Sequence, residues 1–83
     1  MRGIVRLTSK ANGFIAIITD DSEYTVAEIL GGYDIDVGDE ISGDLETLGG
    51  TTFLNLTKSE EMDVYVQDIH ASKKRALDLL DML

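Results

Sequence analysis

The side chains of this 83-residue chain that could do chemistry are mostly carboxylates, and they are densest between residues 34 and 40. This run comprises Asp34, Asp36, Asp39 and Glu40. Several carboxylates so close in sequence suggest a calcium site, because hard cations prefer oxygen ligands. However, Gly38 falls at the third ligand position of an EF-hand alignment, so the run does not match that loop. We expect a solvated turn that leads into a strand, and we predict no metal site.

A second interpretation of the carboxylates is a negatively charged interaction surface. Alternate residues of a strand share one face of a sheet, so the acids within 40–46 would line up behind the acidic run. Such a face could bind a basic protein or imitate a row of phosphates, and the alternative is an outer sheet face that only keeps the protein in solution. The predicted acidic face comprises Asp34, Asp36, Glu40, Asp44 and Glu46.

A smaller set of residues combines bases with aromatic rings. A cation beside an aromatic ring suits a stacked nucleobase, so these residues form the predicted nucleic-acid face. The alternative is that ordinary surface charges flank aromatic residues of the core. The predicted nucleic-acid face comprises Arg6, Lys10, Phe14 and Tyr24.

No arrangement of nucleophile, base and acid is apparent for catalysis. The chain has no cysteine, which excludes disulfides and thiolate metal sites, and its single histidine excludes a cage of several histidines. His70 lies two residues before Ser72 without the spacing of a catalytic set, so a surface histidine at a strand end is expected. We predict neither an enzyme nor a cofactor.

The overall charge limits the classes of partner. Sixteen acids against seven bases give a net charge of −9, which repels phosphate backbones and anionic membranes. No apolar stretch reaches the roughly 20 residues that a membrane span needs. The first residues, Met1 to Val5, are typical of a strand and lack the apolar region of a signal peptide. A cytoplasmic location is therefore expected, with no membrane partner.

The elements that must position these residues are mostly strands. Alternating or β-branched runs predict strands over residues 3–9, 14–19, 23–30, 40–48, 51–57 and 63–69. Asn12-Gly13 is a strong hairpin signal, and Gly49-Gly50 is expected to close a second hairpin. The sequence does not assign residues 33–37 to a helix, a strand or a loop. These runs predict a barrel domain over residues 1–70.

Residues 71–83 are different in kind and predict an amphipathic helix. Ser72 can cap it, and good helix formers follow. An isolated helix of this length is marginal, so its apolar stripe must pack on the barrel or on the same helix of a second subunit. The predicted stripe comprises Ala76, Leu79, Leu80 and Leu83.

Short strands, glycine turns and a terminal helix favour a mainly β fold, a small Greek-key barrel of five to six strands. The alternative is an open α+β sheet covered on one side by the helix. The first 45 residues resemble the oligonucleotide/oligosaccharide-binding (OB) fold, in particular its cold-shock branch. The resemblance rests on Gly3-Ile4-Val5, on Gly13-Phe14 and on Val37-Gly38-Asp39-Glu40-Ile41.

The resemblance implies a barrel fold and binding of single-stranded RNA or DNA by aromatic stacking. The second-strand motif of cold-shock domains, Gly-Phe-Gly-Phe-Ile, here reads Gly13-Phe14-Ile15-Ala16-Ile17 and keeps one aromatic. The third-strand motif would fall near residues 24–28 without its stacking residues. We therefore expect a non-catalytic binding or adaptor module that contacts a protein, or a second copy of itself, through the acidic face or the helix. Weak single-strand binding is the alternative.

Overall fold

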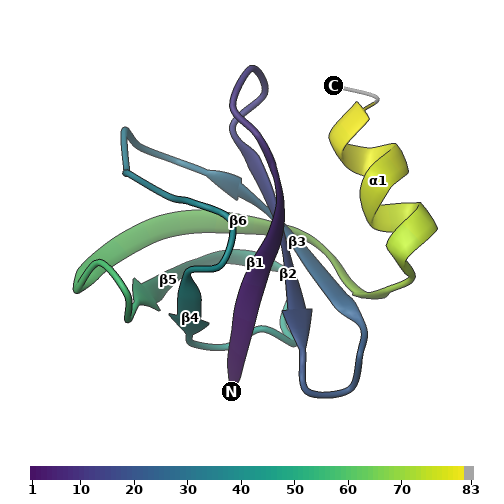
Figure 1. Cartoon of the computed structure of the whole chain (residues 1–83), viewed down its shortest axis with the longest axis horizontal. Coiled ribbons are helices and arrows are strands. Elements are labelled where there is room, and N and C mark those ends of the chain that lie inside the picture. The colour runs from purple at the N-terminus through teal and green to yellow at the C-terminus, as the bar shows by residue number, and fades with distance from the viewer. Residues whose placement is uncertain (82–83) are drawn as a thin grey trace.

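The computed structural model describes residues 1–81, which form six strands and one helix (Figure 1). All neighbouring strands are antiparallel, in the order β1-β2-β3-β6-β5-β4, and β4 pairs with β1 to close a barrel. The predicted small barrel with a short C-terminal helix is confirmed, and the open-sheet alternative is wrong. The elements are β1 Arg2–Ser9, β2 Phe14–Thr19, β3 Tyr24–Ile29, β4 Glu40–Ser42, β5 Gly49–Asn55, β6 Glu60–Ala71 and α1 Lys73–Asp81.

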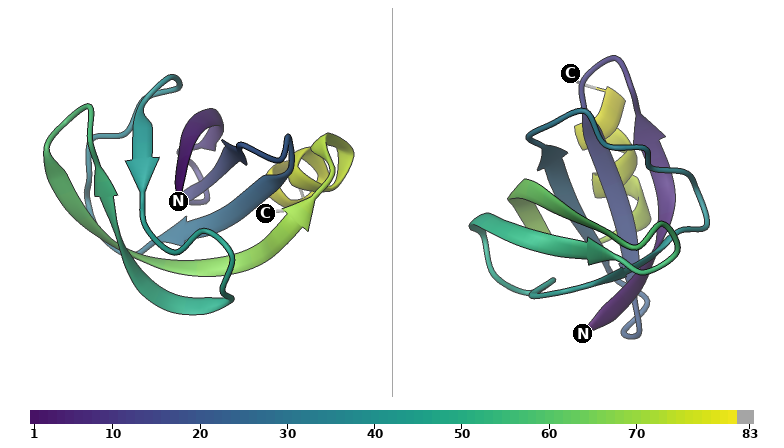
Figure 2. Two further views of the ribbon diagram at one scale, coloured as in Figure 1. Left: turned by 90° about the horizontal axis from the view of Figure 1, so that it is seen from below. Right: turned by 90° about the vertical axis from the view of Figure 1, so that its left-hand side faces the viewer.

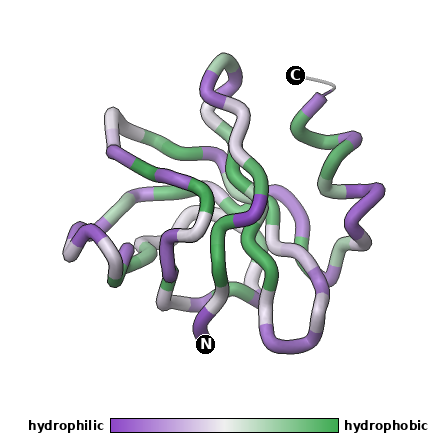
Figure 3. Tube along the Cα trace, viewed as in Figure 1, coloured by the Kyte–Doolittle hydropathy of each residue, from purple (hydrophilic) through white to green (hydrophobic). Residues whose placement is uncertain are grey.

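The barrel interior is apolar because alternate residues of each strand point inward. On β6 the inward positions are Met62, Val64 and Val66, while the residues between them are exposed. Figure 3 shows the same division along the chain, with hydrophobic residues in the strands and hydrophilic residues in the turn between β2 and β3. The buried residues of this interior core are Val5, Ile15, Ile17, Ala27, Ile35, Ile41, Leu45, Phe53, Met62, Val64 and Val66.

A second core lies outside the barrel, between the sheet and α1 (Figure 2). The amide of Arg75 donates to the Ser72 hydroxyl at 3.1 Å, which is the expected N-cap. Ala76 and Leu80 of the predicted stripe are buried against the barrel, and Leu79 is partly buried. Leu83 lies outside the described residues. The sheet residues of this second core are Phe14, Ala16, Tyr24, Val26 and Ala71.

The prediction of one strand over residues 40–48 is wrong, and Gly43 gives the reason. Its φ of 153° lies in the region that favours glycine, and a Cβ there would be 2.8 Å from the Phe53 ring. β4 therefore ends at Ser42, and the chain turns before β5. Gly49 and Gly50 belong to β5 itself, so the hairpin expected at these two residues is also wrong.

Two further features complete the fold. β6 begins at Glu60 and not at residue 63, and it curves across the width of the molecule in Figure 1. Among residues 1–81, no helix is long and apolar enough to cross a membrane.

Candidate functional site

The residues of the predicted acidic face do not form one surface of free charge. Asp36 accepts from Lys58 at 2.9 Å, and Glu40 pairs with Arg2 at 3.4 Å. Asp34 is exposed. The first two carboxylates therefore already have cationic partners within the molecule.

The remaining two acids of that face belong to the turn between β4 and β5. Asp44 accepts from the Thr47 hydroxyl at 2.7 Å and from the amide of Glu46 at 3.2 Å, and these bonds lower the pKa of the Asp44 carboxyl. Glu46 reaches away from this turn, with its Oε2 3.8 Å from Nε2 of His70. Asp44 thus closes a turn, while Glu46 approaches a different cluster.

Asp39 is the exception to the expected solvated turn, since Asp34 and Asp36 are exposed and the chain turns before β4 as predicted. The Asp39 carboxylate is 4% exposed, and its Oδ2 accepts from Asn55 Nδ2 and Lys58 Nζ, both at 2.9 Å. The amide of Asp36 donates to the same oxygen at 3.1 Å. Burial raises the pKa of the Asp39 carboxyl, but these three donors outweigh it and leave the pKa below its ordinary value. Asp39 and Asp36 in turn raise the pKa of Lys58.

The predicted nucleic-acid face is divided between the surface and the second core. Phe14 and Tyr24 are buried where α1 packs on the sheet, so neither ring is an open stacking platform. Arg6 and Lys10 are exposed and line different pockets. Lys10, Phe14 and Tyr33 line a pocket of about 310 Å³.

A continuous surface instead forms on the outside of β3, β6 and β5. Glu28 is paired with Tyr65, and Leu54 is paired with Glu61, so each pair lies on one side of the sheet. The amide of Leu30 donates to the carbonyl of Asp63, which places Leu30 beside the outward-facing residues of β6. We name this surface the tyrosine face, and it comprises Glu28, Leu30, Leu54, Glu61, Asp63 and Tyr65.

The tyrosine face combines exposed apolar groups with unbalanced negative charge. Leu30, Leu54 and Tyr65 are 54%, 40% and 47% exposed. β3, β5 and β6 contain no lysine or arginine. In residues 1–81 no ion pair involves the three acids of the face. A basic ligand would therefore meet carboxylates that have no cationic partner.

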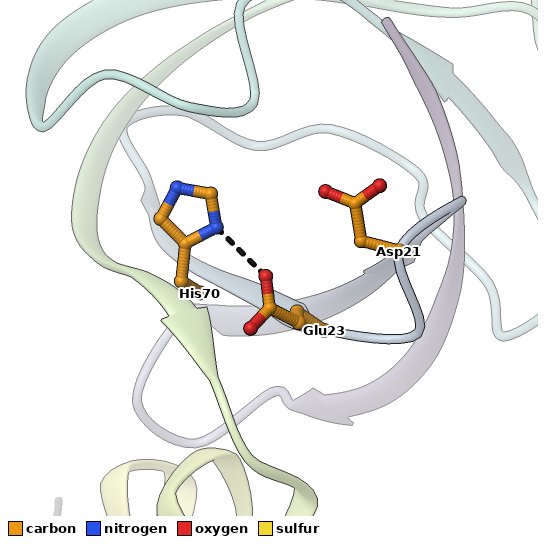
Figure 4. A group of neighbouring side chains, drawn as sticks. All are labelled: Asp21, Glu23 and His70. Carbon is orange, nitrogen blue, oxygen red and sulfur yellow. Dashed lines mark hydrogen bonds and ion pairs between the residues drawn. The ribbon is translucent and has the colours of Figure 1, made fainter.

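A separate cluster joins the β2–β3 turn to the end of β6 (Figure 4). Asp21 and Glu23 come from the turn, and His70 is the penultimate residue of β6. Nδ1 of His70 lies 2.9 Å from Oε1 of Glu23. One ligand atom from each of the three side chains lies within 4.8 Å of the other two. This is the place in residues 1–81 where nitrogen and carboxylate ligands meet.

Both sites combine residues that are distant in sequence, which is why the spacing of residues did not predict them. The only local signal was the alternation over residues 63–69, which places Asp63 and Tyr65 on one face of a strand. Comparisons with protein-family models, with curated proteins and with solved structures found no match to this chain. The candidate sites therefore rest on geometry and charge.

Proposed function

We propose that the protein is a non-catalytic binding module whose tyrosine face recognises a segment of another protein that carries Lys or Arg between apolar side chains. The observation that carries the proposal is the combination on one face of three exposed apolar side chains with three acids that have no cationic partner among residues 1–81. The net charge of −9 supports the sign of the partner.

Each part of the face has a separate role in this proposal. Tyr65 supplies the largest side chain of the face, a stiff contact surface on β6 between β3 and β5, and tyrosine is a common energetic hot spot of interfaces. Its ring can also receive an arginine of the partner through a cation–π contact. The carboxylates of Glu61 and Asp63 speed association and select a basic partner, while Leu30 and Leu54 bury its apolar groups.

The experiment is a fluorescence-anisotropy titration with a labelled peptide of alternating arginine and leucine. Tyr65→Ala should weaken binding at least about tenfold, since it removes the only aromatic side chain of the face. The double variant Glu61→Lys and Asp63→Lys should weaken it by a similar factor and reduce its salt dependence. Circular dichroism confirms that each variant is folded.

A matched control separates the face from the net charge. Asp78→Lys with Asp81→Lys changes the charge by the same amount on the exposed side of α1. This control should retain the affinity of the unchanged protein within about threefold, because the charges lie outside the contact. Equal loss in both double variants would contradict a specific face and leave only general attraction.

Weak binding of single-stranded RNA or DNA is the second candidate, favoured by the pocket that Lys10, Phe14 and Tyr33 share. The same titration with labelled oligonucleotides at low salt tests it, since low salt gives phosphate attraction its greatest effect. Binding that Lys10→Ala abolishes and Tyr65→Ala leaves intact would favour this candidate over the protein partner.

A further inference from the structure

We propose that Asp21, Glu23 and His70 form a binding site for a divalent transition-metal ion such as Zn²⁺. The three side chains point toward a common space in Figure 4. They offer one imidazole nitrogen and two carboxylates, a donor set that suits Zn²⁺ and related ions. The hard ions Ca²⁺ and Mg²⁺ prefer oxygen ligands alone, so the histidine sets the class of ion.

The distances require only small side-chain movements. Metal–ligand bonds of about 2.1 Å at a tetrahedral ion place the ligand atoms about 3.4 Å apart. The ligand atoms here are within 4.8 Å of one another, and Nδ1 of His70 is already 2.9 Å from Glu23. Asp21 and His70 are exposed and Glu23 is half-buried, so rotation of these side chains can close the site.

A carboxylate also lies on the opposite side of the imidazole, where a metal-bound histidine usually has a hydrogen-bond acceptor. Metal-bound histidines usually donate their second ring N–H to a carboxylate or carbonyl, which fixes the ring and its tautomer. Nε2 of His70 faces Oε2 of Glu46 at 3.8 Å. In the metal-bound state, Nδ1 would bind the ion and Nε2–H would donate to Glu46, a positioning residue that must move closer to accept this hydrogen bond.

The backbone holds these residues together without the metal. Tyr24 is paired with Ala71, which brings the β2–β3 turn beside the end of β6. The Thr25 hydroxyl donates to the carbonyl of Leu45 at 2.6 Å and anchors the turn that carries Glu46. A bound ion would therefore link segments distant in sequence, and it would stabilise the folded state because the unfolded chain lacks the site.

The test is calorimetric titration of the full chain with Zn²⁺ and separately with Mg²⁺. We expect one Zn²⁺ site, no Mg²⁺ binding, and a melting temperature that rises with Zn²⁺ concentration. His70→Ala should weaken Zn²⁺ binding more than tenfold, and Glu46→Gln should weaken it about tenfold. Asp78→Asn, which removes an exposed charge on α1, is the control and should leave the affinity unchanged.

Nuclear magnetic resonance of the ¹⁵N-labelled imidazole distinguishes the two ring nitrogens. Coordination through Nδ1 should shift that resonance and retain a proton on Nε2. Unchanged Zn²⁺ affinity in a folded His70→Ala variant would overturn the site, as would an equal loss in Asp78→Asn. Coordination through Nε2 would overturn the assigned ligand set.

Discussion

At the scale of single residues, the buried carboxylate of Asp39 organises the loop before β4. It binds Asn55 and Lys58, which come from the end of β5 and from the turn after it. Asn55 is itself fully buried, and its side-chain oxygen accepts from the amide of Lys58 at 3.0 Å. The loop is therefore tied to the β5–β6 hairpin by a polar network in which each partner satisfies another.

Asn55→Ala should lower the free energy of unfolding by about 1–3 kcal/mol at neutral pH, because it removes a donor from a buried carboxylate. Chemical denaturation measures this change. Asn55→Asp is an informative companion variant, since it keeps the size of the side chain and places a second carboxyl beside Asp39. A loss well below 1 kcal/mol in Asn55→Ala would show that water replaces the missing donor.

The pH dependence follows from the same group. The pKa of Asp39 is lower in the folded state than its ordinary value in an unfolded chain, so its contribution to stability is fully present above that ordinary value. This contribution is lost as the pH falls through the lowered pKa of the folded state. In Asn55→Ala the folded pKa moves upward, so the acid loss of stability should be smaller than in the unchanged protein. An equal loss of stability at acid pH in Asn55→Ala and in the unchanged protein would contradict the role of Asn55.

At the scale of elements, α1 stabilises the barrel through one side only. Leu80 packs with Phe14 and Tyr24 in the second core, whereas Leu77 is 38% exposed. The carbonyl of Leu80 also accepts from Asn12 at 3.4 Å, which ties the end of the helix to the β1–β2 turn. The stability of the helix therefore comes from its packing on the barrel, because a helix this short is marginal in isolation.

Leu80→Ala should cost about 2–4 kcal/mol of unfolding free energy, because it removes buried methyl groups and leaves a cavity. Leu77→Ala, the matched control one turn earlier, should stay within about 0.5 kcal/mol. Urea denaturation of both variants gives the comparison. Equal costs would show that the helix does not dock by the face that the structure assigns to it.

Periodicity predicted the strands that lie between well-marked turns. β2 was predicted with its observed bounds, β1 begins one residue earlier than predicted, and β3 is one residue shorter at each end. The prediction of one strand over residues 40–48 was wrong because the alternation of apolar and polar residues continues through Gly43. The Phe53 ring, which leaves room only for a glycine there, is ten residues away in sequence. Contacts of that kind are set by the closed barrel, so a local pattern cannot reveal them.

The candidate sites were harder to predict than the strands for the same reason. Tyr65 and Glu28 are neighbours only because β3 pairs with β6 in one register. The sequence predicted an acidic interaction surface, but the prediction was placed on a dense run of acids. In the fold, Lys58 and Arg2 form ion pairs with two of these acids. A high density of acids along the chain therefore does not indicate unpaired carboxylates on the surface. Which carboxylates stay unpaired depends on where the fold places the few lysine and arginine side chains.

At the scale of the whole molecule, the excess of acids opposes folding. With sixteen acids and seven bases, most carboxylates repel one another in the compact state. Salt screens this repulsion, since the Debye length falls from about 30 Å at 0.01 M to about 8 Å at 0.15 M. The exposed ion pairs are weakened by the same screening, but such pairs contribute little to stability.

We therefore expect the melting temperature to rise between 0.01 and 0.15 M NaCl. A gain of about 1 kcal/mol would correspond to roughly 4–8 °C for a domain of this size. A variant that combines Asp20→Asn, Asp34→Asn and Asp78→Asn removes three exposed charges and should have a smaller salt response. A melting temperature that falls with salt would mean that the ion pairs outweigh the repulsion. Zn²⁺ at micromolar concentration barely changes ionic strength, so stabilisation under those conditions would come from the site at His70 and not from screening.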